Sequence, residues 1–194
     1  MRLALPGAAA AAAAVAVAAL GAGSAALAEA PFHRTCATHA EGPANGPEPP
    51  YSSRDVRFGR LIFIGLDRRH AWRLRRGADG TLKIPVVVRE GAPVTVRITP
   101  LGRTRARLDF DMSQWRRTGR RVADGDGQRA VRFEACPADT RRFSDGRPLG
   151  PWTGYPGGFL VDRPGCARLT ATAPGMRTVR RRIALGVAVA RCRA

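Results

Sequence analysis

The chain has 194 residues, is 44% hydrophobic and 25% charged, and carries a formal net charge of +18 at pH 7. The length limits it to one domain or two small ones, and the hydrophobic content excludes an intrinsically disordered protein. Four cysteines are too few for a disulfide-dense miniprotein, but they suffice for two disulfides.

Segment 1–28 has the features of a secretory signal peptide. Arg2 precedes an uncharged apolar run over 3–20, and an A-x-A cleavage motif follows at 26–28. We therefore expect cleavage before Glu29, a secreted or cell-wall-associated mature protein, and no stable membrane span after cleavage. An uncleaved anchor is the alternative, because this segment is long enough to cross a bilayer.

The mature chain divides into an arm and a domain. Residues 29–54 are rich in Pro, Gly and small residues and show no periodicity, which predicts an irregular N-terminal arm tied down by Cys36. Residues 55–194 alternate short apolar runs with Gly- and Pro-rich turns, which predicts a single domain.

The apolar runs of this domain predict about eight strands. They lie at 56–66, 83–89, 94–99, 106–112, 130–136, 158–162, 167–173 and 178–189. Such regular spacing is typical of an all-β fold, and we expect an immunoglobulin-like antiparallel β-sandwich. The segment 90–93 has the composition of a hairpin turn between its neighbours. In 106–112, strand alternation places Leu108 and Phe110 inward and Asp109 and Asp111 toward solvent.

Export would make disulfides the default state of the four cysteines, and three pairings are open. If the chain turns at 174–177, Cys166 lies opposite residue 185, and a strand that continues to 189 carries Cys192 beyond disulfide reach. Cys136 ends one predicted strand and Cys166 begins another. We therefore favour Cys136–Cys166, with Cys36–Cys192 joining the two ends of the domain.

No motif predicts catalysis, a metal or another cofactor. No serine lies in a G-x-S-x-G elbow, and no cysteine pair has C-x-x-C spacing. His33, His39 and Cys36 could form a metal site, but a bridged Cys36 is the simpler expectation. A small secreted hydrolase is the alternative function, and a cleft that joins His70 to a carboxylate and a serine would favour it.

The segment 143–166 places aromatic side chains among Gly and Pro residues. Trp152, Tyr155 and Phe159 are candidate binding residues, because exposed rings on a loop can stack on a sugar or a peptide. The alternative, which we favour, is a loop folded onto the sandwich with these rings as anchors.

Arginine supplies nearly all of the positive charge: the chain has 32 Arg and only Lys83 as lysine. Alternation in a strand places Arg180 and Arg182 on the solvent face, which makes them the second set of candidate binding residues. A basic face suits an anionic cell-envelope polymer. Dispersed Arg without Lys is also what GC-rich codons produce on a solvated face, and we expect no specific nucleic-acid partner.

Four short blocks carry a resemblance to a family. They are FEACP at 133–137, GPWT at 150–153, PGGF at 156–159 and PGC at 164–166. This pattern resembles uncharacterised exported proteins of high-GC bacteria, a resemblance that implies export but no activity. The small number of histidines, three, and the absence of a nucleophile motif favour a non-catalytic binding or accessory domain, whose partner would be a cell-envelope polymer or an extracellular protein.

Overall fold

The computed structural model describes residues 29–38, 52–66, 81–111, 113, 126–137, 146 and 150–192. The predicted signal peptide, His39 and His70 lie outside these residues. In the described part of the chain, the regular elements are β-strands and short 3-10 turns, so the all-β prediction is confirmed. None of its helices is long and apolar enough to span a membrane.

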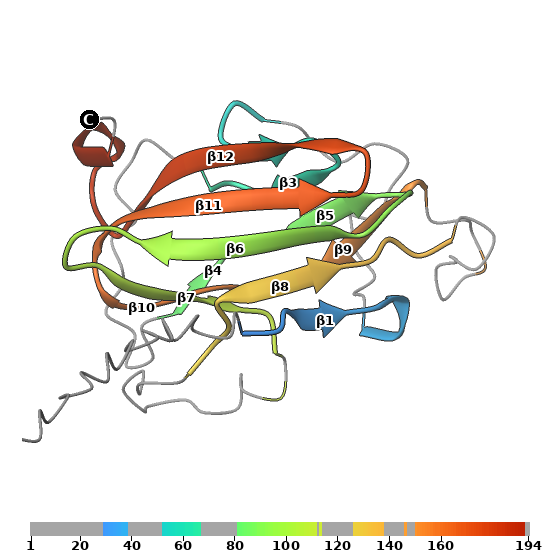
Figure 1. Ribbon diagram of the computed structural model, residues 1–194, viewed down its shortest axis with the longest axis horizontal. Helices are drawn as coiled ribbons and strands as arrows, with labels where there is room; N and C mark the ends of the chain where they lie inside the picture. Colours follow the sequence, from blue (N-terminus) through green and yellow to red (C-terminus); the bar gives the residue numbers. More distant parts are fainter. Residues whose placement is uncertain are drawn as a thin grey trace, which may run out of the picture.

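A five-stranded sheet forms one layer of the fold (Figure 1). Its spatial order is β1-β8-β6-β11-β12, and all neighbours are antiparallel except the parallel pair β1 and β8. The strands are β1 (Phe32–Arg34), β8 (Ala130–Phe133), β6 (Val94–Pro100), β11 (Gly165–Ala173) and β12 (Met176–Leu185).

Two smaller sheets face this layer from behind in Figure 1. The four-stranded sheet has the order β2-β3-β5-β9, with β2 (Val56–Phe58), β3 (Leu61–Phe63), β5 (Val86–Arg89) and β9 (Trp152–Tyr155). The three-stranded sheet has the order β4-β10-β7, with β4 (Thr81–Lys83), β10 (Gly158–Arg163) and β7 (Arg105–Asp109).

One hydrophobic core joins the layers. In β6, Val94, Val96 and Ile98 are buried in this core while the intervening residues point outward, as strand alternation requires. Across the layers, the ring of Phe110 packs edge-on against that of Phe133, with 4.9 Å between centroids. Apolar burial between sheets is therefore what holds the sandwich-like fold together.

Two predicted connections differ from the structure. The single strand expected over 56–66 is the hairpin β2–β3, which turns at Gly59 with a φ of 60°, a conformation that favours glycine. The hairpin expected around 90–93 is wrong, because β5 pairs with β3 and β9 whereas β6 pairs with β8 and β11. This turn instead carries the chain from one layer to the other.

The N-terminal arm is more regular than predicted. Strand β1 lies within it and pairs with β8, placing Arg34 beside Phe133. A 3-10 turn, η1 (Cys36–Thr38), follows directly. The arm is thus the edge of the five-stranded sheet at 32–34, while residues 39–51 lie outside the described chain.

The alternation predicted for 106–112 holds for its apolar residues only. Leu108 and Phe110 are fully buried, as expected. Asp109 is also buried, at 3% exposure, and Asp111 is half-buried, so the expectation that both carboxylates face open solvent is wrong. The strand ends at Asp109, so strict alternation no longer applies beyond it.

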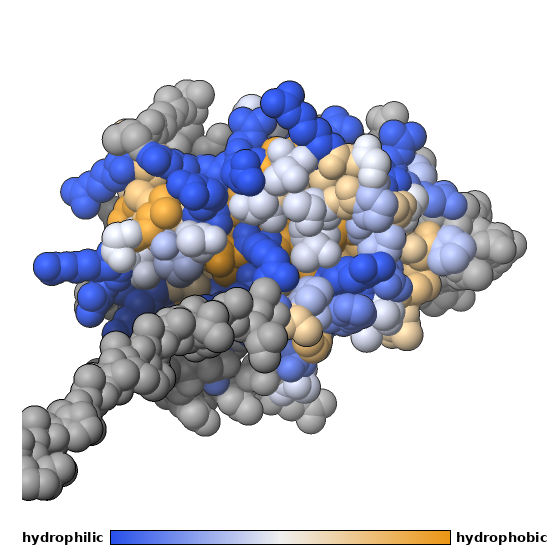
Figure 2. Space-filling model, viewed as in Figure 1, coloured by the Kyte–Doolittle hydropathy of each residue, from blue (hydrophilic) through white to orange (hydrophobic). Residues whose placement is uncertain are grey.

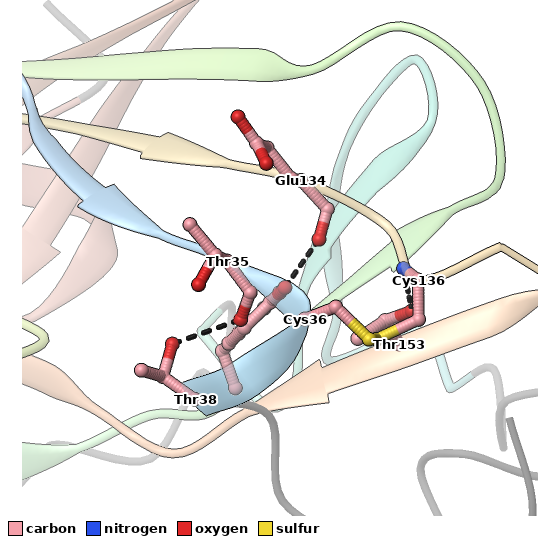
Figure 3. The surroundings of a disulfide bond; sticks show 7 residues. Thr35, Cys36, Thr38, Glu134, Cys136 and Thr153 are labelled. Atoms are coloured by element: carbon pink, nitrogen blue, oxygen red, sulfur yellow. Dashed lines mark hydrogen bonds between the residues drawn. A yellow bond between two sulfur atoms is a disulfide. The ribbon is translucent and has the colours of Figure 1, made fainter. Parts of the chain in front are cut away.

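Both predicted disulfide pairings are wrong. The structure pairs Cys36 with Cys136, with 4.8 Å between their Cα atoms. Because β1 and β8 run parallel, the residues just beyond their ends leave the sheet side by side, and the two cysteines meet there (Figure 3). The sequence alone did not reveal that the arm adds a parallel strand.

The second disulfide joins Cys166 to Cys192, with 5.5 Å between Cα atoms. Cys166 lies opposite Ala184, close to the predicted register. However, β12 ends at Leu185 instead of continuing to 189. Gly186, with a φ of 70°, turns the chain, and the 3-10 turn η5 (Val189–Cys192) brings Cys192 back to β11.

Candidate binding face

The candidate aromatic residues are buried, and the expectation that they are presented on a loop is wrong. Tyr155 and Phe159 have no exposed surface, and Trp152 is 4% exposed. They belong to β9 and β10, not to a loop. The alternative of aromatic anchors on the sandwich therefore describes them correctly.

Tyr155 and Phe159 are part of the core. The ring of Tyr155 lies 5.6 Å from that of Phe133, and the ring of Phe159 stacks on Phe63 at 5.7 Å. The Tyr155 hydroxyl donates a hydrogen bond to the carbonyl of Glu134. The Tyr155 ring thus stabilises the contact between the layers, the Phe159 ring joins the two smaller sheets, and neither has a free face for a ligand.

Trp152 packs on the other side of its sheet. With Ile62 and Val87 it forms a separate apolar cluster on the outer face of the four-stranded sheet, and all three are buried. The apolar part of this outer face is therefore covered, while its neighbours Arg57 and Arg89 are exposed.

The buried Arg34 fixes the N-terminal strand. Its guanidinium donates to the carbonyl of Phe110 at 2.9 Å and to the carbonyl of Thr38, and it lies over the ring of Tyr155, 5.3 Å from the centroid. Burial lowers the pKa of Arg34, while the charges of Tyr155 and Asp111 act in the opposite direction. A cation with this many internal partners has a structural role.

The Cys36–Cys136 disulfide reinforces the same corner (Figure 3). The backbone N–H of Cys136 donates to the hydroxyl of Thr153 in β9 at 2.8 Å. The corner therefore links the edge of the five-stranded sheet to the four-stranded sheet behind it.

A different surface is open: the outer face of the five-stranded sheet (Figure 2). Registers across β8, β6, β11 and β12 place arginines and threonines on it in an alternating pattern. We call it the Arg/Thr face, formed by Thr95, Arg97, Thr99, Arg132, Arg168, Thr170, Thr172, Arg180 and Arg182. In Figure 2, hydrophilic and near-neutral side chains cover the middle of this view.

The predicted pair Arg180 and Arg182 does lie exposed on this face, in β12. Sequence reasoning missed Arg97, Arg132 and Arg168, because it could not show which strands are neighbours. The available signal was the alternation itself: VTVRIT at 94–99 and CARLTAT at 166–172 place Thr or Arg at every second position.

Negative charge is scarce on the Arg/Thr face. Strands β6, β11 and β12 contain no Asp or Glu. Arg132 has an ion pair with Glu134 at 3.7 Å, and a guanidinium N–H of Arg97 reaches the carbonyl of Glu29 at 3.5 Å. Among the described residues, the side chains of Arg168, Arg180 and Arg182 take part in none of the side-chain hydrogen bonds or ion pairs of the structure.

Arg168 and Arg182 form a like-charged cross-strand pair. The register places them directly opposite each other on β11 and β12. Directly opposed like charges destabilise a sheet, and opposite charges at the same positions would stabilise it. This pair therefore costs the fold free energy in the absence of a bound anion.

The described residues give no support to a metal site. Among them, no group of three or more His, Cys, Asp or Glu residues is arranged to hold a metal ion. Cys36, a candidate ligand in the sequence, is in a disulfide. Comparison with protein-family models, with curated proteins and with solved structures finds no match for this chain.

Proposed function

We propose that this protein is an exported, non-catalytic binding domain of the cell envelope, and that its Arg/Thr face binds an anionic polymer. The observation that carries the proposal is a set of three arginines on an open sheet face, the exposed Arg180 and Arg182 and the half-buried Arg168, whose side chains have no acidic partners. A linear polyanion can contact several of these guanidinium groups at once.

Two further features support export. Both disulfides suit an oxidising environment outside the cytoplasm. The signal peptide predicted at 1–28 and the resemblance to exported proteins of high-GC bacteria agree with that location. We also propose that the layered, mostly antiparallel fold is an immunoglobulin-like sandwich, which an experimental structure without a Greek-key strand order would contradict.

The binding proposal is tested by retention on a cell-envelope fraction of the producing organism. The mature protein should be retained at low salt and released at high salt, because salt screens charge contacts. The triple variant Arg97→Gln/Arg168→Gln/Arg182→Gln should be retained far less.

The matched control removes the same charge elsewhere. Arg54, Arg103 and Arg163 are exposed and lie outside the Arg/Thr face. A variant with these three arginines changed to Gln should be retained like the wild type. An equal loss of retention in both triple variants would show that the net charge of the protein, and not this face, causes the binding.

A further inference from the structure

Four arginines of the Arg/Thr face lie on one bent line across the sheet. Arg182 is directly opposite Arg168, Arg168 is diagonal to Arg97 through Thr99, and Arg97 is diagonal to Arg132 through Thr95. Direct neighbours of this kind are separated by about 5 Å and diagonal ones by about 7–8 Å. The line therefore runs perpendicular to the strands from β12 to β11 and then obliquely across β6 to β8.

Threonines flank this line on both sides. Thr170 lies opposite Arg97, and Thr99 lies opposite Arg168. Each guanidinium can donate two parallel N–H bonds to one anionic group, and each threonine hydroxyl can donate one more. The face thus offers charge and neutral donors together, which suits a tetrahedral anion with two free oxygens.

The spacing also suits a particular polymer. In a phosphodiester chain built on three-carbon polyols, successive phosphorus atoms are separated by as many bonds as two residues of a peptide backbone contain. Two extended residues span about 7 Å, so successive phosphates can lie about that far apart. Same-face residues of a strand repeat at about the same interval. Single bonds let such a chain adjust to the bend in this line, whereas a polyuronate carries its carboxylates on rigid rings.

We propose that the Arg/Thr face recognises the phosphodiester groups of a polyol phosphate chain, laid along the line from Arg182 to Arg132. This inference rests on the proposed function and gives the chemical class of its polymer. It requires the forked guanidinium group, not charge alone, because a lysine ammonium cannot make the bidentate contact.

The test compares two probes of equal charge, a glycerol-phosphate oligomer and an oligouronate, by titration calorimetry. We expect the wild type to bind the glycerol-phosphate oligomer with a Kd lower by about tenfold. The variant Arg97→Lys/Arg168→Lys keeps the charge but loses the forked guanidinium groups. Its Kd values for the two probes should therefore be nearly equal. The control Arg54→Lys should keep the preference of the wild type.

The outcomes separate this inference from the proposed function. Equal affinity of the wild type for both probes would overturn the phosphodiester assignment and leave polyanion binding intact. An unchanged preference in the double lysine variant would also overturn it. Binding of neither probe at low salt would overturn both proposals. Thermal unfolding of each variant confirms that a lost preference does not come from lost structure.

Discussion

The two outer faces of this molecule are built oppositely. The outer face of the four-stranded sheet carries the buried Ile62, Val87 and Trp152, with exposed Arg57 and Arg89 beside them. The outer face of the five-stranded sheet carries exposed and half-buried arginines and threonines and contributes little to apolar burial. Substitutions on the first face should therefore change stability, and those on the second should change binding.

The largest stability effect is expected at the corner that joins the layers. Replacing Cys36 and Cys136 with Ala frees a loop with a sequence separation of 100 residues, and the chain-entropy relation gives a loss of about 4.7 kcal/mol. Replacing Cys166 and Cys192 opens a separation of 26 residues, for which the same relation gives about 3.5 kcal/mol. Denaturant unfolding of both double variants measures the two losses in free energy of unfolding. A larger loss in the Cys166/Cys192 variant than in the Cys36/Cys136 variant would contradict this prediction.

The next largest effect on stability is expected at the apolar cluster on the outer face of the four-stranded sheet. Trp152→Ala should lower the free energy of unfolding by about 3–5 kcal/mol, because it leaves a cavity beside Ile62 and Val87. Arg168→Ala, on the open face, should change it by about 0.5 kcal/mol or less. Urea melts check both, and Trp152→Phe provides a milder variant should the alanine variant fail to fold. A small effect at Trp152 would mean that the face is not truly covered.

The open face should show its effect in the salt dependence of binding. For a single-stranded polyanion, each charge contact contributes about 0.7 to the slope of log K against log salt. Arg168→Gln should therefore reduce this slope by about 0.7 for an anionic polymer. Arg54→Gln, outside the face, should leave it unchanged. Affinities measured over a range of salt concentrations give both slopes. Equal slopes for the two variants would show that Arg168 does not contact the polymer.

The sequence predicted strands better than it predicted their neighbours. Alternation correctly placed Leu108 and Phe110 in the core and Arg180 and Arg182 outside. It could not show that β1 adds to the sheet in parallel, and the disulfide pairing depended on that contact. Pairing between distant strands is set by packing over the whole domain, which no local pattern records.

The binding residues illustrate the same limit. The Gly- and Pro-rich surroundings of Trp152 suggested an exposed loop, but its side chain packs on a sheet built from distant segments. Conversely, Arg97 and Arg168 looked dispersed in the chain and are close neighbours on the sheet. Charge that appears scattered in a sequence can gather on one face once strands pair.

The substitution Arg182→Glu tests most directly whether the arginines of the Arg/Thr face serve binding and not stability. It replaces the like-charged cross-strand pair with an opposite-charged one, so the free energy of unfolding should rise by about 0.2–1 kcal/mol. Affinity for an anionic polymer at low salt should fall in the same protein. Both are measured on one preparation, by denaturant unfolding and by calorimetric titration. A less stable variant, or one that binds the polymer as tightly as the wild type, would contradict the account.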